Sequence, residues 1–404
     1  MELFSQKMIP PVYAVGVAGA FLQIIAAQWD VSAHILGIVE TFFTPAHTVL
    51  YTGIALVALA SFYGLLLRSK TVGNGSLNHS LFAGVSIAAV GSSLQIIAAP
   101  IDFWWHSTNG FDPFLFTPAH SLLIIGLILG GAGMTVGSIR LLLSLRAGQQ
   151  LTNRPRFVPA IVLLALATIW AQLNFFGYWI TDVTGMAYTF GYCSIQQFRA
   201  SVPCPFVQQY SIAAFLIEAG IFAASGTLVF WTSKSIFHRT GVITSISLIL
   251  AAIYSATALG FSAYALRFLN PPGSWYINNA TPDQGTRLAL FIPIYLLSLI
   301  PILVLDLLTK NSAGRSRPLG LSAFVGPFAA LIDGRYTLGL SESGVEALAF
   351  VVGPMILGVI LGWVLLTRLA RGLVPNLTIR YARSITGGPI SEKRPIGQLR
   401  EPEK

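Results

Sequence analysis

Three residues near the N-terminus have types and a spacing that could bind a metal ion. Asp30 and His34 lie four residues apart, and His47 follows 13 residues after His34. Because helix positions four apart lie on one face, one turn apart, the first two side chains would project together. Carboxylates and imidazoles are ligands for zinc, copper and non-haem iron. The pattern therefore predicts a metal site made by Asp30, His34 and His47.

This pattern belongs to a longer stretch of sequence that occurs twice. The six residues that begin at Leu22 recur from Leu94, and the motif Thr-Pro-Ala-His ends at His47 and again at His120. The offset is 72 residues for the first match and 73 for the second. Self-similarity of this kind predicts a tandem repeat within residues 1–150. The first and second copies cover about residues 15–70 and 87–146.

The second copy supplies its own set of candidate ligands, which are Asp102, His106 and His120. Four more polar residues occupy matching positions in the two copies. One carboxylate follows the first His of each copy by six residues, and one glutamine precedes each Asp by seven, on the same helix stripe. We expect these residues to be extra ligands or to hold the ligands in place. They are Glu40 and Asp112, and Gln23 and Gln95.

The motif Thr-Pro-Ala-His predicts the start of a helix. Thr44 can cap the helix, Pro45 suits the first helical position, and His47 falls in the first turn. The positive end of the helix dipole disfavours imidazolium there, and neutral imidazole is the form that binds metals. The alternative is that these residues only cap helix ends and hydrogen-bond to each other.

The composition excludes an ordinary soluble domain. Of 404 residues, 54% are hydrophobic and only 10% are charged. We expect an all-α, polytopic transmembrane bundle, because about 20 apolar residues cross a bilayer as a helix. Ten spans are predicted, and nine are the alternative because the ninth is interrupted by polar residues. The spans are residues 10–30, 45–67, 81–103, 118–144, 157–179, 209–232, 241–266, 287–309, 319–338 and 345–367.

Basic residues follow every even-numbered span, as Arg68 and Lys234 illustrate. By the positive-inside rule, both termini face the cytoplasm. Each copy contains two spans, so both copies enter the membrane from the same face. We therefore expect both metal sites on the extracytoplasmic side. The net charge of +9 is explained by topology, and no nucleic-acid motif is present, so no nucleic acid partner is expected.

The rest of the chain carries fewer signals. Cys193 and Cys204 lie in an outward loop, where an oxidising exterior would join them as a disulfide; two unpaired cysteines are the alternative. Asp306 is expected to be solvated at the cytoplasmic face. We assign no role to the further helices in residues 151–371. The basic tail, residues 372–404, is expected to be disordered or to lie on anionic lipid in the cytoplasm.

The pattern Asp-x3-His-x12-His, with Phe-Thr-Pro-Ala-His opening the next helix, resembles the C subunit of the copper membrane monooxygenases. These are the particulate methane and ammonia monooxygenases. The resemblance covers roughly residues 15–130 and implies copper bound by Asp30, His34 and His47. In the second copy Asp102 replaces the family's Asn, and His120 lies one residue later than the family pattern. The resemblance implies a subunit of an oxidative membrane complex, with other membrane subunits as partners.

Alternatives remain open from the residues alone. Zinc and non-haem iron suit the same ligands, whereas a bis-His haem would leave the paired carboxylates unexplained. The chain could instead be a metal transporter or metal-delivery protein, or a structural subunit of a membrane complex or homo-oligomer. Trp104 and Trp105 are interpreted as anchors at the bilayer interface, the alternative being an aromatic wall for a small apolar substrate.

Overall fold

The computed structural model describes most of the N-terminal half of the chain and part of the rest. The described residues are 2–35, 42–70, 76–109, 117–146, 157–183 and 239–268, short stretches within 217–237 and 299–307, and residues 360 and 364. The chain divides into the units Met1–Thr367 and Arg368–Lys404. The second unit, which contains the predicted tail, lies outside the described residues, as do Cys193 and Cys204.

Six helices have defined bounds, and no strand occurs among the described residues. They are α1 (Glu2–Ile35), α2 (Pro45–Lys70), α3 (Ser76–Asn109), α4 (Pro118–Arg146), α5 (Val158–Val183) and α7 (Val242–Phe268). Helices α1 to α5 each contain a segment long and apolar enough to cross a membrane. These segments are Met8–Asp30, Pro45–Arg68, Gly84–Trp105, Pro118–Arg146 and Val158–Gly177.

The five segments agree with the first five predicted spans, and the chain is an integral membrane protein built from helices. Helix α7 occupies the position of the seventh predicted span, with a shorter apolar stretch at Val242–Ile253. The other predicted spans lie largely outside the described residues, so the total of ten stays a prediction.

Helices α2 and α4 begin where the repeated motif predicts. The carbonyl of Thr44 accepts a hydrogen bond from Thr48 N–H at 2.8 Å, and that of Thr117 accepts one from Ser121 N–H at 2.9 Å. Both threonines are therefore N-cap residues, and a proline follows each of them at the first helical position. The predicted helix starts are confirmed.

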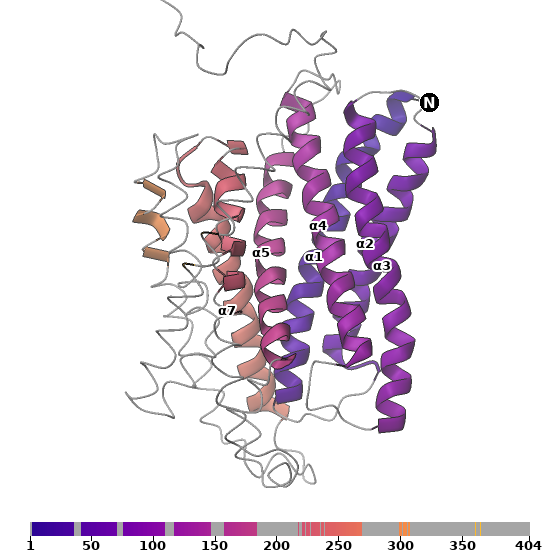
Figure 1. Ribbon diagram of the computed structural model, residues 1–404, viewed down its shortest axis with the longest axis vertical. Helices are drawn as coiled ribbons and strands as arrows, with labels where there is room; N and C mark the ends of the chain where they lie inside the picture. Colours follow the sequence, from indigo (N-terminus) through magenta and orange to yellow (C-terminus); the bar gives the residue numbers. More distant parts are fainter. Residues whose placement is uncertain are drawn as a thin grey trace, which may run out of the picture. The chain divides into compact units, whose positions relative to one another are not determined.

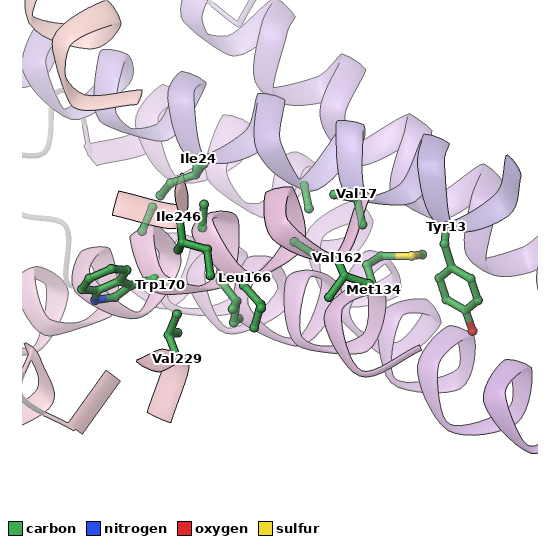
Figure 2. Close-up of a cluster of buried hydrophobic side chains, with 14 of the residues drawn as sticks. Tyr13, Val17, Ile24, Met134, Val162, Leu166, Trp170, Val229 and Ile246 are labelled. Atoms are coloured by element: carbon green, nitrogen blue, oxygen red, sulfur yellow. The ribbon is translucent and has the colours of Figure 1, made fainter. Parts of the chain in front are cut away.

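The first four helices close into a ring: α1 packs on α2, α2 on α3, α3 on α4, and α4 on α1. Helix α5 lies against α1 and α4, and α7 lies against α5 and α1 (Figure 1). Buried apolar side chains from α1, α4, α5 and α7 fill the space between these helices. Figure 2 labels nine of the buried side chains, of which Val229 comes from the short stretches between α5 and α7: Tyr13, Val17, Ile24, Met134, Val162, Leu166, Trp170, Val229 and Ile246.

Other large apolar side chains point away from the bundle, as expected for a surface that contacts lipid. Leu59 is 66% exposed, Leu66 60% and Ile97 52%. A soluble monomer rarely presents many such side chains together, whereas a bilayer solvates them without cost. Their exposure supports the membrane setting of these helices.

Two of the helix contacts bring backbones together at glycines. An ideal Cβ placed on Gly53 of α2 would lie 2.7 Å from the carbonyl oxygen of Gly19 in α1. One placed on Gly126 of α4 would lie 2.6 Å from the carbonyl oxygen of Gly91 in α3. Small residues allow this close approach, which is common between membrane helices. The two crossings occur at positions that the 72- and 73-residue offsets relate.

The expectation that Asp306 is solvated is wrong, because its side chain is fully buried. Lys234 Nζ donates to Asp306 Oδ1, and Oδ2 accepts hydrogen bonds from the N–H and hydroxyl of Thr244 at 3.1 and 3.0 Å. Thr244 lies in the first turn of α7, where backbone N–H groups lack partners within the helix. Asp306 thus pairs with a lysine and also caps a helix 62 residues away in the sequence.

Candidate metal centre

The first aspartate–histidine pair joins the end of α1 to the start of α2. His47 Nε2 lies 2.8 Å from Asp30 Oδ1, and the two side chains are only 13% and 10% exposed. The His47 ring stacks on the ring of Tyr51, one turn further along α2, with centroids 5.9 Å apart. The spacing of Asp30 and His47 therefore places a carboxylate and an imidazole in contact.

The second pair joins α3 to α4 at the matching positions. His120 Nε2 lies 3.3 Å from Asp102 Oδ1, and the two side chains are 7% and 19% exposed. His120 N–H donates to Thr117 Oγ1 at 3.2 Å, and the same hydroxyl oxygen lies 3.0 Å from His120 Nδ1. Thr117 thus caps α4 and also contacts Nδ1 of the His120 ring, while Nε2 of the same ring faces Asp102.

Both pairs lie at the same end of the four-helix ring, because α1 and α3 end there and α2 and α4 begin there (Figure 1). Aromatic rings connect them. Phe42, just before α2, contacts Phe103 of α3 with ring centroids 5.4 Å apart, and contacts Tyr51 at 5.0 Å. A series of aromatic contacts therefore runs from His47 through Tyr51 and Phe42 to Phe103, the residue that follows Asp102.

The two predicted glutamines meet each other. Gln95 Nε2 donates to Gln23 Oε1 at 2.9 Å, and both side chains are fully buried. Gln23 lies against Gly53, and Gln95 lies against Gly126, each through its Cγ. The bond joins α1 to α3 two helical turns from the carboxylates. The suggested supporting role beside Asp30 and Asp102 stays a prediction.

Two polar residues of α5 also bond to neighbouring helices. Gln172 Nε2 donates to the carbonyl of Ala20 in α1 at 3.4 Å, and Asn174 Oδ1 accepts from the Ser225 hydroxyl at 3.1 Å. These bonds satisfy Gln172 Nε2 and Asn174 Oδ1, whereas Gln172 Oε1 is buried without a hydrogen-bond partner within the described residues. They fasten α5 to the bundle that carries the aspartate–histidine pairs.

The separations in both pairs suit ligands of a single metal ion. Two ligand atoms bonded at about 2.0–2.1 Å and subtending 90–109° lie roughly 2.9–3.4 Å apart. The measured 2.8 and 3.3 Å fall at or near this range. The contact of Thr117 with His120 Nδ1 matches a common arrangement, in which a metal-bound imidazole donates its other N–H to an oxygen. Direct hydrogen bonding between Asp and His gives the same distances.

Several predicted ligands cannot be placed. The side chains of His34 and His106, and the whole of Glu40 and Asp112, lie outside the described residues. Within the part that is described, no group of three or more His, Cys, Asp or Glu residues comes together. Each site is therefore described by two of its predicted ligands. The search of protein-family models, of curated proteins and of solved structures finds no match to the chain.

Proposed function

We propose that this chain is an integral membrane copper-binding protein that acts as a subunit of an oxidative complex of the copper membrane monooxygenase type. One site would use Asp30, His34 and His47, and the other Asp102, His106 and His120. The observation that carries the proposal is a carboxylate–imidazole contact that occurs twice, at matching positions and at one end of the same four helices.

The proposal includes a tandem duplication of a helix pair. Its support is the repeated sequence, the glycine crossings at related positions, and the two Asp–His contacts at offsets of 72 and 73 residues. Because each copy holds two spans, the pseudo-axis would run along the membrane normal. We place both termini in the cytoplasm and both sites toward the extracytoplasmic side, from the distribution of basic residues.

Burial supports a functional role for these groups. Counted over the whole residue, Asp30 is 7% exposed and His120 is 5% exposed. Ionisable groups at membrane helix ends are costly unless they are paired or bind a ligand. His47 and His120 both lie in the first turn of their helices, so the two rings occupy matching places in the bundle. Copper held there would supply one-electron chemistry. The residues themselves would fix its position.

The alternative is a metal transporter or metal-delivery protein. The Gln23–Gln95 bond favours this alternative, because it places polar atoms in the centre of the ring two turns from the aspartates. The same ligands would then form an entry site, with the amides further along the path. Uptake of copper into vesicles without oxidative turnover would support transport over the oxidative role.

Metal analysis of detergent-purified protein tests the proposal. We would measure copper by elemental mass spectrometry and paramagnetic resonance in the wild type, His47→Asn, His120→Asn and the double variant. Each single variant should lose one site's copper, and the double variant should lose both. His238→Asn, in a predicted cytoplasmic loop, is the matched control and should keep full copper. Full copper content in all three ligand variants would refute the proposal.

A further inference from the structure

The two aspartate–histidine pairs are held by different side chains, although their sequences match closely. In the second pair, the Thr117 hydroxyl contacts both the backbone N–H and the ring Nδ1 of His120. In the first pair, Thr44 holds the same motif position, yet its buried hydroxyl has no hydrogen-bond partner within the described residues. There the His47 ring stacks on Tyr51, whose place in the second copy is taken by Ile124.

A threonine hydroxyl can hydrogen-bond to Nδ1 in either tautomer of a neutral imidazole. It has one hydrogen and two lone pairs, and at Thr117 one lone pair accepts the His120 backbone N–H. The hydrogen can be donated to a bare Nδ1, or the second lone pair can accept a hydrogen from Nδ1. In both cases Nδ1 keeps its partner at 3.0 Å and Nε2 keeps facing Asp102.

We propose that Thr117 is the positioning residue of the second site, and that it orients the His120 ring so that Nε2 points at Asp102. Ligation through Nε2 requires the ring hydrogen on Nδ1, where Thr117 Oγ1 accepts it. In the first site the Thr44 hydroxyl makes no such bond within the described residues, and the His47 ring stacks on Tyr51. The threonine of the repeated motif therefore contacts the imidazole in the second site and not in the first. The consequence for copper rests on the proposed function, whereas the ring orientation does not.

The orientation is tested on metal-free protein by ¹⁵N resonance of the histidine ring nitrogens, with the His120 signals assigned through His120→Asn. Thr117→Val removes the hydroxyl. Thr117→Gly also removes it but preserves most of the helix cap, so it keeps the test valid if the valine variant folds poorly. Thr117→Ser keeps the hydroxyl, and Thr44→Val is the matched control in the first copy.

The wild type and Thr117→Ser should give the same His120 Nδ1 resonance, because the hydroxyl bonds to that nitrogen in both. Thr117→Val and Thr117→Gly should shift the His120 Nδ1 resonance, because that nitrogen loses its hydrogen-bond partner, and Thr44→Val should leave the His120 signals unchanged. If both hydroxyl-free variants give the wild-type His120 signals, Thr117 does not position the ring.

Copper titration provides the second readout. Loss of a residue that orients a ligand typically weakens metal binding about 10–100-fold. We expect Thr117→Val and Thr117→Gly to weaken only the second site by this factor, and Thr44→Val to weaken neither site. Affinity within twofold of wild type at the second site would overturn the positioning role. A wild type that binds no copper would refute the proposed function, while the metal-free spectra would still decide the role of Thr117.

Discussion

Replacing Gly126 by alanine tests whether the backbones of α3 and α4 are in contact. The added Cβ would lie 2.6 Å from the Gly91 carbonyl oxygen and 2.6 Å from Gln95 Cγ, where ordinary contact begins at 3.4 Å. The carbonyl belongs to a helix backbone and cannot rotate away. The two helices must therefore separate by about 0.8 Å at this crossing, against the close packing of the bundle.

The size of the effect follows from two opposing contributions. Overpacking of this kind costs about 1–3 kcal/mol. Alanine in place of glycine inside a helix recovers about 0.5–1 kcal/mol. We expect Gly126→Ala to lower the free energy of unfolding by roughly 0.5–2 kcal/mol. Gly130→Ala, one turn further along α4, is the matched control, because its Cβ would meet only Val57 Cγ1 at 3.5 Å.

The assay is reversible unfolding in mixed detergent micelles, followed by helical circular dichroism as the denaturing detergent is increased. Gly130→Ala should be as stable as the wild type or about 0.5–1 kcal/mol more stable, since only the helix propensity changes. If Gly126→Ala is as stable as Gly130→Ala, the two helix backbones do not touch at Gly91 and the described crossing is wrong.

Two further predictions use the same unfolding assay. Asp306→Asn should lower the free energy of unfolding by about 3–5 kcal/mol, because it leaves the Lys234 charge without its buried partner. Adding Lys234→Met should recover much of that loss. If the effects of the two substitutions are fully additive, the ion pair is contradicted. Gln95→Leu should cost about 0.5–2 kcal/mol by leaving the buried Gln23 amide unpaired, and adding Gln23→Leu should cost little more. Equal and additive losses would show that the two amides do not bond.

Local signals in the sequence predicted the first half of the fold well. Thr44 and Thr117 precede proline and histidine, and each occupies the N-cap position as expected, although only the Thr117 hydroxyl makes the capping hydrogen bond. The first five spans were predictable because a helix must have about 20 apolar residues to cross a bilayer. The approach of Asp30 to His47 follows from a short connection between antiparallel helices. Whether these residues bind copper stays a prediction.

Contacts that depend on the packing of several helices were not predictable. Gln23 and Gln95 were interpreted as supports for the aspartates, because a single helix shows only which residues share a stripe. Their bond to each other arises where α1 and α3 meet across the four-helix ring. The burial of Asp306 was likewise not predictable from a single helix. Its partners Lys234 and Thr244 are 72 and 62 residues away, and no local pattern marks such an association.

The glycine crossings also determine which movements the bundle permits. Backbone contact at Gly19 and Gly53, and at Gly91 and Gly126, holds the two helices of each pair close together. Both Asp–His contacts lie inside these pairs, whereas the Gln23–Gln95 bond lies between them. A rocking motion of one pair against the other would thus break one amide bond while leaving each carboxylate with its imidazole. Such a motion would also change the distance between the two sites, because each site lies within one helix pair.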